Sequence, residues 1–260
     1  MSDIYAYYQN YDESTRLTRD RLHYGEYYVT MHLLRKYLGD QPLKILDCCA
    51  GCGIFAEALA GTGHIVTAGD LIPEHVAYMK ENCTGLSEIY EGSVCDLSRF
   101  DDESFDAVLN FGAMYHLQDP DERKLAVSEC LRVLRHGGIF AYTYQSLEAM
   151  ILGGYHEAVR CLDEQKRLDS YRRMEESRQT HCRGLFYGMT PEEVNALAAE
   201  NNLLFVANAN TYPVFYPFFR EIDSYTEEEY ARWLEVCIAV CEDKTVVNNC
   251  MHGLWFGRKP

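Results

Sequence analysis

The chain has 260 residues, a formal net charge of −16 at pH 7 and a hydrophobic content of 47%. This content argues against general disorder, and the acidic balance disfavours a nucleic-acid partner because phosphate backbones would be repelled. No apolar run reaches the roughly 18 residues of a membrane span, and the polar start does not resemble a signal peptide. The sequence therefore predicts one cytoplasmic globular domain whose 11 cysteines are reduced thiols.

The first half of the chain alternates between predicted helices and strands. A helix is expected over 14–38, ended by the turn residues at 39–42. Arg16 would lie on the surface of this helix, with pairing to a ligand carboxylate as the alternative. The segments that follow are strands over 43–48, 64–69, 88–92 and 105–111, with helices over 53–61 and from Pro73 onward. Strands that alternate with helices indicate a doubly wound, mostly parallel α/β sheet.

The second half begins with a helix that has clear start signals. Asp119 can cap it, and Pro120 suits its first position. Its apolar residues recur on one face, and Gly137-Gly138 is expected to end it before a strand over 139–144. Arg132 and Arg135 would then lie in its last turn.

Two helical insertions interrupt the later alternation, over 146–185 and 212–245. Capping boxes begin helices at Thr190 and Thr226. Strands are expected over 203–209 and 246–258, which brings the number of predicted strands to seven. The predicted organisation is one domain with an N-terminal helical cap over 1–39, a ligand-binding core over 40–145 and the two inserted cap segments.

The most informative stretch is the strand 43–48, which runs into a turn that contains Gly51 and Gly53. Glycines at such a turn let a nucleotide-like ligand approach the backbone. Asp70 ends the next strand, Asp96 follows the third, and Asn110 lies near the end of the fourth. Because the ends of parallel strands meet along one edge, these residues predict a ligand-binding crevice there.

Asp47-x-x-x-Gly51-x-Gly53, Asp70, Asp96 and Phe105-Asp106-Ala107-Val108 occur in the order of the motifs of class I S-adenosylmethionine (SAM) methyltransferases. The segments 112–117 and 131–138 extend this resemblance, which looks most like the small-molecule branch, the type 11 or ubiquinone-biosynthesis methyltransferases. It covers roughly 40–145, and 186–260 more loosely. It implies a Rossmann-like, seven-stranded sheet with an antiparallel last strand, SAM as cofactor, S-adenosylhomocysteine as product and a small-molecule acceptor.

The resemblance also implies roles for residues at the crevice. Asp47 would hold the ammonium of SAM, Asp70 the ribose hydroxyls and Asp96 the adenine amino group. The other cofactor-binding candidates are neighbours of these acids on the same turns: Cys49, Ala50, Gly51, Gly53, Leu71, Cys95, Leu97, Asn110 and Phe111. Relatives usually carry glycine at position 49. Simpler alternatives are an ordinary turn around Asp47, a helix cap at Asp70 and a turn acid at Asp96.

His116 and Tyr115 are the catalytic candidates, at the mouth where the methyl group would leave. Histidine titrates near neutrality, so His116 could act as a general base; it could equally orient a loop. A thiolate or neutral amine acceptor needs little acid–base help, and alignment can supply most of the rate. Tyrosines in residues 1–25 and the aromatic segment 212–219 could form a lid over the acceptor, pack on the sheet edge or make a homodimer contact.

Other functions are compatible with parts of the pattern. Gly51-x-Gly53 followed by an acid also occurs in nicotinamide-dependent oxidoreductases, and a SAM-binding regulatory protein without turnover would show the same motifs. Cys48 and Cys49 are consecutive on a strand, so their side chains point to opposite faces, and no metal site is expected at them or at Cys52. An arsenic methyltransferase that binds the metalloid through thiols is a further alternative.

Overall fold

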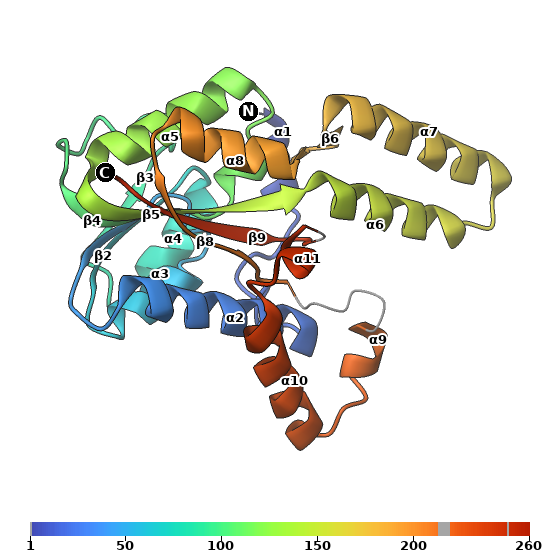
Figure 1. Ribbon diagram of the computed structural model, residues 1–260, viewed down its shortest axis with the longest axis horizontal. Coiled ribbons are helices and arrows are strands. Elements are labelled where there is room, and N and C mark those ends of the chain that lie inside the picture. Colours follow the sequence, from blue (N-terminus) through green and yellow to red (C-terminus); the bar gives the residue numbers. More distant parts are fainter. Residues whose placement is uncertain (1, 213–218, 249) are drawn as a thin grey trace.

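The computed structural model describes residues 2–212, 219–248 and 250–260 (Figure 1). At its centre, five parallel strands lie in the order β3-β2-β1-β4-β5. Their bounds are β1 Lys44–Asp47, β2 Ile65–Asp70, β3 Glu88–Glu91, β4 Phe105–Asn110 and β5 Leu134–Ser146. β1 lies between β2 and β4, so later strands of the chain are added on both sides of β1. A ligand crevice forms at such a switch point in open α/β sheets.

Two antiparallel strands complete the predicted sheet. β9 (Gly253–Arg258) pairs with β5 on one side and with β8 (Leu204–Asn210) on the other. The doubly wound, mostly parallel sheet with an antiparallel last strand is therefore confirmed. A short hairpin, β6 (Cys182–Arg183) and β7 (Phe186–Met189), was not predicted, and it extends the end of β5 at Gln145 and Ser146.

Helices cover both faces of the sheet (Figure 1). Successive strand residues point to opposite faces, so Ile45 packs with one set of helices and Leu46 with the other. The first set comprises α2 (Arg21–Leu38), α3 (Ile54–Ala60), α4 (Pro73–Asn82) and α10 (Glu227–Val240). The second set comprises α5 (Pro120–Val133) and α8 (Pro191–Glu200). The capping boxes predicted at Thr190 and Thr226 begin α8 and α10.

The N-terminal helix begins later than residue 14, so this prediction was wrong. The side chain of Asp20 accepts a hydrogen bond from the His23 N–H at 2.9 Å and starts α2 at Arg21. A separate helix, α1 (Ser2–Tyr8), which was not predicted, precedes turns over residues 9–20. Arg16 consequently lies in a turn and not on a helix surface.

The end of α5 also differs from the prediction. The helix stops at Val133, and Leu134 already pairs with Phe105 in the first residues of β5. Arg135 is therefore outside the helix. Gly137 has a φ of 77° and donates its N–H to the carbonyl of Lys259, which places the two glycines within the irregular start of β5. Burial of Leu134 overrides the local stop signal.

The predicted insertion over 146–185 is a helical pair, α6 (Leu147–Val159) and α7 (Glu164–Thr180), which extends beyond the sheet (Figure 1). The second insertion contains α9 (Phe219–Ile222), α10 and α11 (Lys244–Val247). Most of the aromatic segment 212–219 lies outside the described residues. Within the described part of the chain, no helix combines the length and apolar character needed to cross a membrane.

Candidate functional site

A cavity of about 320 Å³ lies at the carboxyl ends of β1, β2, β4 and β5. This volume is at the lower end of the range of small-molecule sites, roughly 300–1,000 Å³. Nine of the predicted site residues line it: Asp47, Cys49, Ala50, Gly51, Asp70, Leu71, Phe111, Tyr115 and His116. Five do not: Gly53, Cys95, Asp96, Leu97 and Asn110. The switch-point crevice is thus hollow, and most predicted residues meet in it.

The turn after β1 needs its two glycines. Gly51 has a φ of 55° and Gly53 a φ of 81°, both in the left-handed region. A Cβ on Gly51 would lie 3.3 Å from the side chain of Glu13, and one on Gly53 would lie 2.9 Å from both Cys83 and Met79. Gly53 therefore shapes the turn from behind, against α4, whereas Gly51 faces the cavity.

Asp70 fixes the backbone around this turn. One carboxylate oxygen accepts from the Gly51 N–H at 2.7 Å, and the other accepts from the Ile72 N–H at 2.9 Å and contacts His75 Nδ1 at 3.1 Å. The helix-cap alternative is present in the Ile72 contact, because Ile72 precedes α4. The oxygen bonded to Gly51 keeps a second lone pair for a ligand donor.

Asp47 is the least satisfied charged group of the site. Its side chain is 1% exposed, and neither carboxylate oxygen has a hydrogen-bond partner within the described structure. Burial raises the pKa of Asp47 to about 7, and the charge of Asp70 adds to this rise. An unpaired buried carboxyl group beside a cavity fits a ligand that supplies a positive charge and N–H donors.

The residues predicted for the adenine end lie elsewhere. Asp96 is exposed and accepts from the Ser98 N–H at 3.1 Å, as a turn acid does. Cys95 donates to the Glu122 carbonyl, and Leu97 belongs to the core under α5. Backbone and side chains of 92–94 line this part of the cavity instead.

Asn110, another predicted residue, lies outside the cavity lining, whereas Cys48, which was not predicted for the site, lines the cavity. Asn110 is fully buried, and its Oδ1 accepts from Cys49 Sγ at 3.7 Å while its Nδ2 has no partner in the described structure. Cys48 Sγ packs 3.8 Å from Cys130 Sγ in the core. Among the described residues, no group of three or more histidine, cysteine or acidic side chains is suited to a metal ion.

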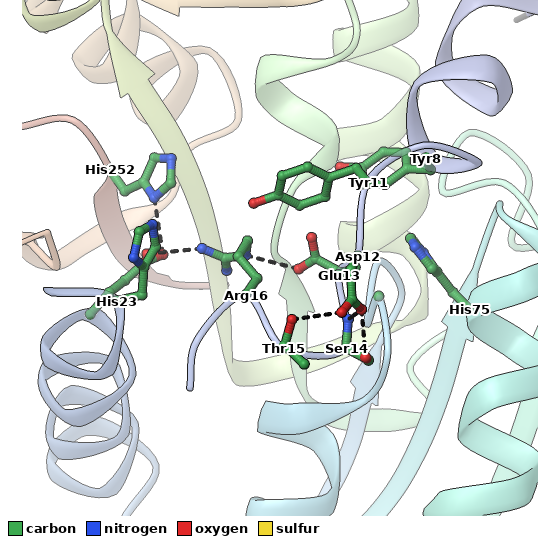
Figure 2. A network of polar contacts seen from close by, with 12 residues as sticks. Tyr8, Tyr11, Asp12, Glu13, Ser14, Thr15, Arg16, His23, His75 and His252 are labelled. Atoms are coloured by element: carbon green, nitrogen blue, oxygen red, sulfur yellow. Dashed lines mark hydrogen bonds and ion pairs between the residues drawn. The ribbon is translucent and has the colours of Figure 1, made fainter. Parts of the chain in front are cut away.

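A charged network crosses the cavity wall, and sequence reasoning missed it. Arg16 donates from Nε to Glu13 and from Nη1 to Glu26, both at 2.9 Å, and His252 Nδ1 lies 3.0 Å from the other oxygen of Glu26. Figure 2 shows Arg16 between Glu13 and the part of the network that holds His252. Burial opposes ionisation of Glu26, yet Arg16 and His252 hold its pKa at about 2. All four residues line the cavity.

The only local signal for this network is an acidic residue on the otherwise buried face of α2. Glu26 is 5% exposed and sits next to Val29 and Thr30 on that face. A buried acid needs a partner, but the partner at position 252 is 226 residues away. No spacing rule connects the two.

His116 is held between two partners. Its Nε2 lies 2.9 Å from Tyr8 Oη, and its Nδ1 lies 3.4 Å from the Leu185 carbonyl. Burial lowers the pKa of His116 to about 4, so the ring is neutral at pH 7. With Nδ1 as donor, the Nε2 lone pair is taken by the Tyr8 hydroxyl. This arrangement favours the orienting role of His116 over that of a general base.

Aromatic side chains form the remaining walls. The ring of Tyr115 is parallel to that of His252 within 4°, with centroids 5.8 Å apart, and Phe186 packs against both Tyr115 and His116. Tyr7 and Tyr8 bring α1 over the cavity, and Tyr7 meets Phe186 edge to face at 5.8 Å. The cavity therefore has an acidic end at β1 and β2 and an aromatic end at β5 and β9.

The comparisons with known proteins match the part of the chain that holds β1, the turn after it and the neighbouring strands. Residues 46–142 match a family model described as "Methyltransferase domain". The chain is 37% identical over 98 residues to demethylmenaquinone methyltransferase of Clavibacter sepedonicus (36% of this chain, 38% of the relative). It is 27% identical over 122 residues to ubiquinone biosynthesis O-methyltransferase of Cereibacter sphaeroides (43% and 48%). The chain thus spans less than half the length of these relatives.

Solved structures show the same fold over nearly the whole chain. The PH0226 protein of Pyrococcus horikoshii has a TM-score of 0.63 at 19% identity and covers 98% of this chain and 99% of its own. The 1,6-didemethyltoxoflavin-N1-methyltransferase of Burkholderia thailandensis, solved with 1,6-didemethyltoxoflavin and S-adenosylhomocysteine, has a TM-score of 0.56 at 16% identity (98% and 84%). The fold that the resemblance implies is therefore confirmed.

Proposed function

We propose that this chain transfers a methyl group from SAM to a small-molecule acceptor. The observation that carries the proposal is Asp47, an unpaired buried carboxyl group beside the Gly51 turn, inside a cavity formed by the matched methyltransferase domain. SAM carries an ammonium group and a sulfonium, which together supply the missing positive charge and donors. The relatives support methyl transfer over a nicotinamide-dependent oxidoreductase.

Different residues of the cavity would contact different parts of SAM. Asp47 would hold the ammonium, Gly51 and its neighbours Cys49 and Ala50 would flank the methionine part, and Asp70 with Leu71 would face the ribose. Residues 92–94 would lie along the adenine, while the assignment of Asp96 to the adenine remains a prediction that the cavity lining does not favour. When bound, SAM supplies a methyl group that a nucleophile attacks in line with the leaving sulfur.

The segments outside the core would select the acceptor. We infer a single domain over 1–260 in which 1–39, 146–185 and 212–245 cap the core over 40–145. The same proposal includes location in the cytoplasm and assembly as a homodimer. It also includes the absence of a nucleic-acid partner, which the acidic net charge of −16 supports.

We expect S-adenosylhomocysteine, but not NAD, to stabilise the purified protein. At 100 times its dissociation constant, a ligand that binds only the folded state adds about 2.7 kcal/mol, which for this chain length corresponds to a rise in Tm of about 5–10 °C. Differential scanning fluorimetry with both ligands measures this. A rise with NAD alone would overturn the proposal. Transfer of radiolabelled methyl groups from SAM into a metabolite extract then separates an enzyme from a SAM-binding regulator.

Deletion of residues 1–12 should impair turnover far more than ligand binding. The deleted segment contributes Tyr7, Tyr8 and Tyr11 to the aromatic end of the cavity but leaves Glu13 and Arg16 in place. We expect turnover to fall at least about tenfold, because water enters and the acceptor loses its wall, while S-adenosylhomocysteine affinity changes less than about threefold. Calorimetry and the methyl-transfer assay give the two numbers. Tyr24→Phe, an exposed tyrosine outside the cavity, is the control. Full-rate methylation by the folded, truncated protein would exclude an N-terminal lid.

A further inference from the structure

The aromatic end of the cavity contains a histidine–carboxylate pair that none of the assigned roles uses. His252 precedes β9, and its Nδ1 lies 3.0 Å from Glu26 Oε1. Both side chains line the cavity; that of His252 retains 18% exposure and that of Glu26 retains 7%, so the histidine is the more accessible of the two. A histidine oriented by a buried carboxylate is the arrangement that proton-abstracting enzymes use.

The partners of the His252 ring determine which nitrogen carries the proton. Glu26 is ionised and can only accept, so Nδ1 must donate to it. On the other side of the ring, the amide Nε2 of Gln145 lies 3.3 Å from His252 Nε2, and an amide nitrogen can only donate. The lone pair of the neutral ring therefore resides on Nε2, on the side of Gln145, which also lines the cavity. The Gln145 contact is long enough for a stronger donor to replace it.

Charged and titratable groups face the His252 ring from several elements. Glu26 faces it from α2, with Arg16 bound to the far oxygen of Glu26, so the carboxylate stays ionised as the ring gains a proton. The other titratable groups that face His252 are Tyr115 from η1 (Ala113–Tyr115), Tyr212 after β8 and the neutral His116. Tyr115 stacks on the ring and fixes its plane. His116, by contrast, has no carboxylate partner among its described contacts.

The position of His252 in the sheet suits an acceptor and not the cofactor. Between β1, which carries Asp47, and β9 lie β4 and β5, so the two sites are three strand spacings apart, roughly 14 Å. Phe111 and Gly112 line the cavity between them, after β4. Thr143 and Gln145 of β5 line the same end as His252, and Thr143 Oγ1 has no partner in the described structure. This end thus offers an acceptor and a donor beside the base.

We propose that His252 is the general base of the methyl transfer and that Glu26 is its positioning residue, so the acceptor is a hydroxyl group. The inference rests on the proposed function. The acceptor's lone pair forms the bond to the methyl carbon, the carbon–sulfur pair leaves on sulfur, and the acceptor's proton moves to His252 Nε2. Glu26 stabilises the imidazolium, which then releases the proton to water.

The first test compares acceptors that need a base with one that does not. Catechol is the hydroxyl probe, and benzenethiol, largely ionised at pH 8, is the thiol probe; radiolabelled SAM reports transfer. We expect His252→Asn to lower kcat/KM at least about 100-fold with the hydroxyl acceptor and to lower transfer to the thiol much less. Glu26→Gln should cause a smaller loss. Transfer by wild-type protein to the thiol alone would overturn the proposal.

The pH profile separates a base from a structural residue. The acidic limb of kcat/KM should be absent in His252→Asn, should move to lower pH in Glu26→Gln and should be retained in His136→Asn, an exposed histidine outside the cavity. S-adenosylhomocysteine affinity, measured by calorimetry, should stay within about threefold in all three variants. An unchanged limb in His252→Asn would exclude the base, and a parallel loss of affinity would assign His252 to the cofactor.

A spectroscopic test needs no turnover. In ¹⁵N-labelled protein, the long-range imidazole spectrum should show His252, identified by its loss in His252→Asn, as the tautomer with the proton on Nδ1. A proton on Nε2 would overturn the proposal. If the wild-type protein fails to bind S-adenosylhomocysteine, the proposed function falls; if it binds and methylates while His252→Asn keeps its rate, only the present inference falls.

Discussion

Replacement of Asp47 by asparagine should stabilise the ligand-free protein and abolish SAM binding. In the folded state burial raises the pKa of Asp47 to about 7, whereas an unfolded aspartate ionises near 3.9. Between these values the folded state holds one proton more than the unfolded state, so stability falls as pH rises through this window. About 3 pKa units correspond to about 4 kcal/mol, which is lost fully only above pH 7. We expect Asp47→Asn to recover up to this amount at pH 8.

Urea unfolding at pH 8 and at pH 4 measures the effect, which should be large at the higher pH and small at the lower one. Asp101→Asn, at an exposed aspartate outside the cavity, serves as control and should change stability little at either pH. In Asp47→Asn, the thermal shift by S-adenosylhomocysteine should disappear. A destabilised Asp47→Asn that still binds S-adenosylhomocysteine would show that the carboxylate serves the fold and not the ligand.

The parts of the fold that were predictable depend on short-range rules. The apolar run before Gly51, the acid at the end of β2 and the two capping boxes each follow from residues within about five positions, and the mostly parallel sheet follows from the alternation of strands and helices. Where the prediction failed, a longer-range contact decided. Gly137-Gly138 looks like a helix end, but Leu134 pairs with Phe105 in the sheet and ends α5 earlier. The unpredicted α1 meets the cavity through Tyr8, whose partner is His116.

The candidate site divides in the same way. Its acidic end at β1 and β2 was predictable because a single turn and the ends of adjacent strands supply it. Its aromatic end was not, because Glu26 and His252 come from α2 and from the residue before β9, and only the folded sheet brings them together. Asp96 shows the limit of reading spacing alone: the acid follows β3, yet its turn directs the side chain to solvent.

Replacement of Arg16 by methionine should destabilise the protein by about 3–5 kcal/mol at pH 7, because it leaves the buried Glu26 charge with only His252 as partner. The pH dependence of the free energy of unfolding should also change sign. In the wild-type protein the pKa of Glu26 is about 2, below its ordinary value of 4.5, so its contribution is present above pH 4.5 and is lost as pH falls toward 2. Without Arg16, burial opposes ionisation unaided, and acidification from pH 7 to pH 5 should stabilise the variant.

Two further variants separate the buried charge from the loss of a long side chain. Arg172→Met removes an exposed arginine that pairs with Asp169 at 3.0 Å, and it should change stability by less than about 0.5 kcal/mol. Arg16→Met with Glu26→Gln removes both charges while glutamine still accepts from His252, so it should recover most of the loss. Urea unfolding at pH 7 and pH 5 measures all three. If the double variant is as unstable as Arg16→Met, the loss comes from the packing of Arg16 and not from the unpaired charge.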